Sequence, residues 1–183
     1  MLARVPVALR VDAARPLGVS VPAVRAAAEA MLRALGLRRA ELSIVLCDDR
    51  AMRELNRRHR GKDRTTDVLA FALREGPALA GADSDWLGDV VISVPTAARQ
   101  AREAKKMPAD EVRMLLAHGL LHLLGFDHQT AAQARRMSAR TDALLAASAP
   151  APRTLRGEKR DPRARARRLR IARRSPLGES SRR

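Results

Sequence analysis

The sequence is poor in aromatic residues, cysteine and long apolar runs. Its 183 residues include two Phe, one Trp and no Tyr, too few rings for an extended stacking surface. Cys47 is the only cysteine, which excludes an intramolecular disulfide and a closed metal site made of several thiolates. No run approaches the roughly 18 apolar residues of a membrane span, and residues 1–14 lack a signal-peptide core. We therefore expect a globular protein of the cytoplasm, with no membrane partner.

Acidic residues are also scarce relative to basic ones, and the imbalance is greatest at the C-terminal end. The formal net charge is +16, and residues 149–183 hold 13 of the 36 Lys and Arg but only three of the 20 Asp and Glu. This segment has no aromatic residue and too few apolar residues to build a core. We predict a folded domain over 1–148 and a disordered, Arg-rich tail over 149–183, which either binds polyanions without specificity or only aids solubility.

Hydrophobic periodicity predicts four strands and five helices. The strands are expected at 6–11, 41–47, 67–73 and 88–94, where apolar and β-branched residues gather in short runs. The helices are expected at 20–35, 48–59, 96–106, 108–124 and 129–147, with caps and glycines near several of their ends. The helices gather late in the chain instead of alternating with every strand. This order predicts an α+β fold, a single domain with a small mixed four-stranded sheet packed with about five helices.

Three of the four histidines lie in one stretch, Leu115 to His128. His118 and His122 are four residues apart, so they share one face of the predicted helix. Gly125 favours a helix end and a turn that brings His128 back toward the other two. Three protein ligands with an open fourth position are typical of catalytic zinc. We predict one Zn²⁺ ion on these three histidines, although imidazoles also suit other divalent metals.

The spacing of the histidines matches the metzincin metalloproteases in all but one position. Those enzymes read H-E-x-x-H-x-x-G-x-x-H, and their glutamate takes a proton from the zinc-bound water. Gly119 stands in that place here and has no group that could do so. Proteolysis by that route is not expected, whereas hydrolysis by a water of lowered pKa remains available.

A second dense motif, Leu55 to Phe71, supplies positive charge. It contains five basic residues within eight positions: Arg57, Arg58, Arg60, Lys62 and Arg64. The planar guanidinium group suits bidentate contact with phosphate. The cluster predicts either a phosphate-binding patch or an ordinary solvated turn. His59 is expected to be structural, and Asn56 and Asp67 are expected to cap or tie the turn.

Together these motifs resemble one known family. The stretches L-N-x-x-x-R-G-K-D-x-x-T-D-V-L-x-F from Leu55 and H-G-x-L-H-L-x-G-x-D-H from His118, joined by L-G-D-V-V-I-S from Leu87, resemble the YbeY family of bacterial endoribonucleases. The resemblance covers about residues 5–145. It implies a zincin-like α+β fold and zinc-dependent hydrolysis of single-stranded RNA. It also implies a role with the ribosome, in maturation of ribosomal RNA at the small-subunit 3′ end and in ribosome quality control.

The resemblance also implies roles for individual residues. His118, His122 and His128 would bind zinc, and Arg60 would be the functional arginine. Asp127 matches the family's acidic residue beside the third histidine, and we expect its carboxylate to orient a ligating ring, as carboxylates beside such histidines often do. With RNA as the substrate, the composition of the basic cluster separately predicts that Arg57, Arg58, Lys62 and Arg64 bind RNA. Either water or the 2′-hydroxyl group could be the nucleophile. The alternatives are a ribosome-associated RNA-binding assembly factor with a structural metal, and a metal-dependent hydrolase of another substrate such as a peptide.

Overall fold

The computed structural model describes residues 7–12, 18–73 and 86–150. In chain order the elements are β1 (Val7–Val11), α1 (Val21–Ala34), β2 (Glu41–Cys47), α2 (Asp49–Arg60), β3 (Val68–Ala72), β4 (Trp86–Ser93), α3 (Val94–Glu103), α4 (Pro108–Leu123) and α5 (Ala131–Ala147). The four strands and five helices predicted from the sequence are all present, within a few residues of the expected bounds. The predicted disordered tail and the loop at 75–85 lie outside the described residues, apart from the first two residues of the tail.

The four strands form one mixed sheet in the order β1-β2-β4-β3. Strands β1, β2 and β4 are parallel, and β3 runs antiparallel to β4 at the edge, with Val68 opposite Ile92. The α+β class and the mixed sheet are therefore confirmed. Within the described residues, no helix is long and apolar enough to cross a membrane.

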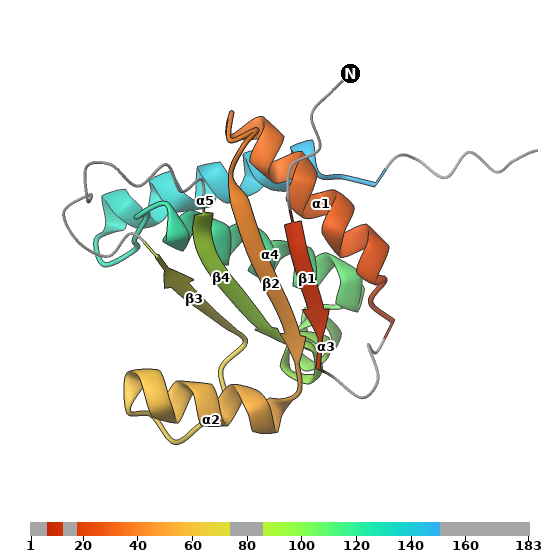
Figure 1. The fold of residues 1–183 in the computed structure, drawn as a ribbon, viewed down its shortest axis with the longest axis vertical. Coiled ribbons are helices and arrows are strands. Elements are labelled where there is room, and N and C mark those ends of the chain that lie inside the picture. The colour runs from red at the N-terminus through yellow and green to blue at the C-terminus, as the bar shows by residue number, and fades with distance from the viewer. Residues whose placement is uncertain (1–6, 13–17, 74–85, 151–183) are drawn as a thin grey trace, which may run out of the picture. The chain divides into compact units, whose positions relative to one another are not determined.

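Side chains that alternate along the strands divide between two hydrophobic clusters. On one face Ile44, Leu46, Val90 and Ile92 are fully buried under α1 and α4, which Figure 1 shows lying together on the same side of the sheet. This alternation is the period of two that an extended strand imposes on its side chains. The main core thus fixes α4, the helix that carries two of the histidines, against β3 and β4.

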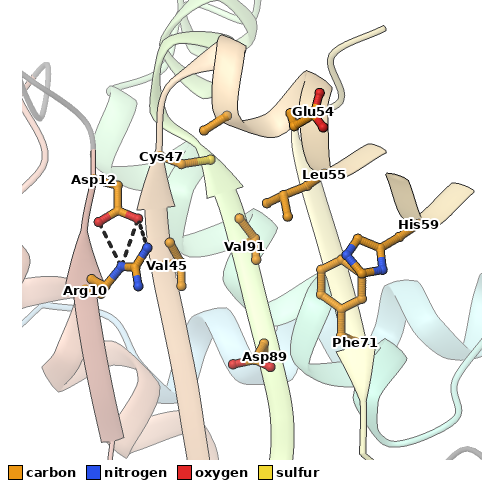
Figure 2. Close-up of a pocket in the computed structure, with 11 residues that line it drawn as sticks. Arg10, Asp12, Val45, Cys47, Glu54, Leu55, His59, Phe71, Asp89 and Val91 are labelled. Atoms are coloured by element: carbon orange, nitrogen blue, oxygen red, sulfur yellow. Dashed lines mark hydrogen bonds and ion pairs between the residues drawn. The ribbon is translucent and has the colours of Figure 1, made fainter. Parts of the chain in front are cut away.

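The other face of the sheet is covered only in part, by α2. Met52 connects α2 to this face, since it packs with Leu69 and Val91 in a second, smaller cluster. A cavity of about 590 Å³ opens beside it and is lined mainly by apolar side chains of the sheet and α2, as Figure 2 shows. The rings of His59 and Phe71 meet edge to face at its border, with centroids 4.9 Å apart. A packing role for His59 agrees with the structural role predicted for it.

Candidate metal centre

Helix α4 places His118 and His122 at the same point of the molecule. The helix begins with Pro108, whose missing N–H costs nothing in the first turn, and Asp110 and Glu111 carry negative charge there. Most of its remaining side chains are buried, so the helix cannot rotate without exposing the core. His118 and His122 are half-buried on the side that remains open.

The turn after α4 brings the third histidine back. Gly125 has a φ of 80°, the left-handed conformation that the sequence predicted, and its N–H donates to the His122 carbonyl oxygen at 3.0 Å. The Phe126 N–H donates to the Leu121 carbonyl oxygen, also at 3.0 Å. The exposed His128 therefore returns toward the helix end that the chain has just left.

The three imidazoles converge as predicted. One ring nitrogen from each residue lies within 4.8 Å of the others, and the Nε2 atoms of His118 and His122 are 3.2 Å apart. Two nitrogens bound tetrahedrally to one Zn²⁺ at about 2.0–2.1 Å would be roughly 3.4 Å apart, which is close to this separation. The ring centroids of His118 and His122 are 5.5 and 5.3 Å from that of His128. This cluster could hold a metal ion.

The electrostatics of the cluster favour neutral rings. Burial lowers the pKa of His118, as do the positive charges that His122 and His128 would carry. The pKa of His122 is lowered by burial first and then by His128, with a smaller effect from Arg60. Because a cation binds the neutral imidazole, these shifts extend the pH range over which the rings can act as ligands.

Gly119 lies where α4 packs closely against β3 and β4. A Cβ atom added there would be 2.7 Å from Val90 Cγ1 and 3.2 Å from Val68 Cγ2. The sequence predicts only that the protease glutamate is missing at this position. The structure adds a packing reason, since any side chain here would push against β3 and β4.

Arg60 is the last residue of α2 and is exposed. It follows Met52 and Asn56, the two buried residues of this helix, at a spacing of four, so all three share the face turned toward the protein. Its positive charge helps to lower the pKa of His122. The fold therefore brings the charge of Arg60, from a helix some sixty residues earlier, within electrostatic range of the histidine cluster.

The other predicted residues differ in their surroundings. Asp127 accepts a hydrogen bond from the His128 backbone N–H at 2.7 Å, so it supports the turn rather than an imidazole ring. Arg57 is ion-paired with Glu54 at 2.8 Å. Arg58, Lys62 and Arg64 are exposed. The sequence predicts one basic patch, whereas the structure divides these side chains between paired and exposed environments.

Asp67 was predicted only to cap or tie the turn after α2, but it also acts on the histidine cluster. Its Oδ1 atom accepts from the Val68 N–H at 2.8 Å, and its Oδ2 atom accepts from Gln100 Nε2 at 3.0 Å. Its negative charge acts on His118, partly opposing the lowering of that pKa. The T-D-V-L motif marked this residue in the sequence, but its position beside His118 depends on how β3 packs on α4.

The fold and the cluster define a class: an α+β protein with a three-histidine group at the end of one helix that could hold a metal ion. The family model described as Endoribonuclease YbeY matches residues 19–149, and the chain belongs to that family. The match begins after β1.

Individual relatives agree with the family match. An endoribonuclease YbeY from an Anaeromyxobacter species is 50% identical over 139 residues, covering 75% of this chain and 70% of the relative. One from Moorella thermoacetica is 54% identical over 112 residues, covering 58% of this chain and 72% of the relative. The solution structure of a Thermotoga maritima protein is 20% identical and covers 82% of this chain and 99% of its own, with a TM-score of 0.53. That structural likeness supports the fold.

Proposed function

We propose that this protein is a zinc-dependent endoribonuclease that cleaves single-stranded RNA. The observation that carries the proposal is the convergence of three imidazole nitrogens within electrostatic range of Arg60, in a chain of the endoribonuclease YbeY family. As its biological setting we propose cytoplasmic maturation of ribosomal RNA at the small-subunit 3′ end and ribosome quality control, with precursor ribosomal RNA and the ribosome as partners.

His118, His122 and His128 would hold the ion. A zinc ion on three imidazoles supplies a Lewis acid and lowers the pKa of a bound water to about 7. The lowered pKa values of His118 and His122 favour neutral rings, each with one unprotonated nitrogen that can bind a metal ion. The Asp127 carboxylate holds the backbone of the turn and thereby the position of His128.

Arg60 would act on the phosphate group. Negative charge on the non-bridging oxygens of a phosphodiester must be stabilised when the bond breaks, and a guanidinium group can donate two parallel hydrogen bonds to them. Arg60 is the last residue of α2, where its charge acts on His122, and its backbone is held by the turn that begins at Gly61. Its proposed role is therefore to orient the scissile phosphate and stabilise its charge.

Metal analysis of untagged protein, paired with cleavage of a single-stranded ribosomal RNA fragment before and after chelation, tests the proposal. We expect about one zinc ion per chain, cleavage that chelation abolishes, and loss of both in a His122→Ala variant. Folded His122→Ala protein that lacks zinc but still supports ribosome binding and RNA processing would favour the assembly-factor alternative. Digestion of casein by the wild type would favour the peptide-hydrolase alternative.

A further inference from the structure

Helix α2 borders a second hollow, of about 550 Å³, beside its N-terminal half. Its lining is entirely polar or charged: Asp49, Arg50, Arg53, Asp63, Arg64 and Thr65. Three of these residues are cationic and two are anionic, so the lining suits a charged ligand.

The two carboxylates of this hollow already have arginine partners. Asp63 accepts from Arg53 Nε at 2.7 Å and from its Nη2 atom at 2.6 Å. Asp49 accepts from Arg99 Nη1 at 2.7 Å. Each negative charge is thus balanced within the protein, and an anion that enters would not face an unpaired carboxylate.

Arg50 and Arg64 are the lining residues whose charges remain uncompensated. Both are exposed, and within residues 7–12, 18–73 and 86–150 neither side chain makes a hydrogen bond or an ion pair. A guanidinium group in this state is suited to contact with a phosphate group.

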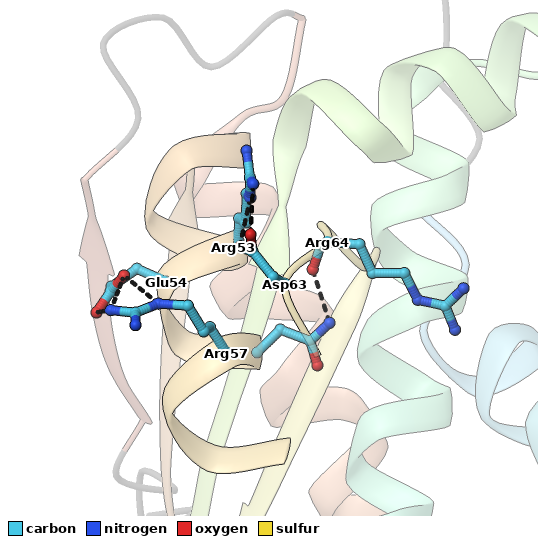
Figure 3. A network of polar contacts seen from close by, with 6 residues as sticks. Arg53, Glu54, Arg57, Asp63 and Arg64 are labelled. Carbon is cyan, nitrogen blue, oxygen red and sulfur yellow. Dashed lines mark hydrogen bonds and ion pairs between the residues drawn. The ribbon is translucent and has the colours of Figure 1, made fainter. Parts of the chain in front are cut away.

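The loop that carries Arg64 is held firmly against α2. Asn56, 3% exposed, donates from Nδ2 to the Arg64 carbonyl oxygen at 2.7 Å, and the Arg53–Asp63 pair fastens the same loop one residue earlier. Figure 3 shows these contacts, with the Arg64 side chain extending away from the two ion pairs. The backbone of Arg64 is therefore fixed before any ligand arrives, which lowers the entropic cost of binding.

The hollow lies beside the N-terminal half of α2, whereas Arg60 is the last residue of that helix. Arg50 and Arg60 are ten residues apart on α2, which corresponds to about 15 Å along its axis. That span exceeds a single nucleotide, so a phosphate at the hollow would belong to a different nucleotide from one at Arg60. We propose that Arg50 and Arg64 form a second phosphate-binding subsite, which holds the RNA backbone outside the cleavage site. The identity of the ligand as RNA rests on the proposed function.

Salt-dependent binding tests this subsite. The probe is oligouridylate, as a trinucleotide and as a dodecanucleotide, with full-length protein and a chelator that prevents cleavage. For single-stranded RNA, the slope of log K against log salt becomes shallower by about 0.7 for each phosphate contact that is removed. We expect Arg50→Ala/Arg64→Ala to lower that slope by about 1.4 for the dodecanucleotide. The loss of affinity caused by this double substitution should be larger for the dodecanucleotide than for the trinucleotide.

Two variants make the comparison specific. Arg38→Ala/Arg39→Ala removes the same charge from an exposed turn between α1 and β2 and should lower the slope far less. Arg50→Lys/Arg64→Lys keeps the charge and should retain most of the wild-type slope. Equal slopes for the subsite variant and the Arg38/Arg39 control would overturn the subsite. Cleavage is measured separately, without the chelator. A wild type that binds with the expected slope but cleaves no RNA in that second assay would overturn the proposed function and leave the subsite standing.

Discussion

Arg60 illustrates how a long, exposed side chain can be given a defined place. Its helix is capped by Gly61, whose φ of 65° lets the chain turn back. The Gly61 N–H donates the last hydrogen bond of the helix to the Arg57 carbonyl oxygen. The following loop returns to α2 through Asn56. The base of Arg60 is thus fixed by backbone geometry, while its guanidinium group stays free to meet a substrate.

Replacing Arg60 separates its role from that of the metal ligands. We expect Arg60→Ala to lower RNA cleavage by about a hundredfold, the usual cost of removing one donor to a developing charge, while the zinc content stays the same. Cleavage rates and metal content of the purified variant check this, with Arg39→Ala as the control for one lost positive charge. Loss of zinc from Arg60→Ala would contradict the assigned role.

Gly119 makes a packing prediction. We expect Gly119→Ala to lower the free energy of unfolding by about 1–3 kcal/mol, because its methyl group would press on Val90. Denaturant unfolding measures this. In a double-mutant cycle, Val90→Ala should recover part of the loss by making room for the new methyl group. Additive effects of the two substitutions would show that the close approach at Val90 is not the cause.

At the scale of elements, a polar junction joins α2 to the end of β4 and the start of α3. Asp49 is in the first turn of α2, and its Oδ1 atom accepts from Ser93 Oγ at 2.5 Å and from Thr96 Oγ1 at 2.7 Å. Burial acts to raise the pKa of Asp49, but hydrogen bonds from Arg99, Ser93 and Thr96 outweigh it and hold the pKa below its usual value. This junction sets where α2, and therefore Arg60, lies relative to the sheet.

The junction should contribute measurably to stability. We expect Asp49→Asn to lower the free energy of unfolding by about 1–3 kcal/mol, because the amide cannot replace all the hydrogen bonds of a charged acceptor. Glu54→Gln is a matched control, since Glu54 belongs to an exposed ion pair worth about 0–1 kcal/mol. Urea unfolding of both variants makes the comparison, and equal losses would show that Asp49 is only a surface charge.

For the whole molecule, the histidine cluster links stability to pH. The pKa values of His118 and His122 are below their ordinary 6.5 in the folded chain, so the unfolded chain binds protons first as the pH falls. This contribution to stability is present above about pH 6.5 and is lost progressively below it. We expect the melting temperature of metal-free protein to decrease from pH 7 toward pH 5.

Substitution and metal addition check the source of that pH dependence. A His118→Gln/His122→Gln variant should show a shallower decrease than the wild type, because the two titrating groups are gone. Zinc should raise the melting temperature of the wild type at pH 7, by mass action on the folded state, and should not raise that of the variant. A variant as steeply pH-dependent as the wild type would assign the effect to other groups.

The sequence alone determined the elements and the chemistry that each could carry. Apolar periodicity placed the strands, and capping residues together with the left-handed Gly125 marked helix ends, because these signals act over a few residues. The spacing of His118, His122 and His128 predicted their convergence for the same reason, since one helical turn and one glycine turn bring the rings together.

Only the tertiary structure decided what depends on contacts between distant segments. The charge of Arg60 near His122, the position of Asp67 beside His118 and the fit of Gly119 against Val90 all require α2, β3, β4 and α4 to be packed together. Whether an arginine of α2 or the following loop is ion-paired, as Arg53 and Arg57 are, likewise depends on which acids the fold brings within reach. Local sequence sets which groups are available, whereas long-range packing sets which of them face one another.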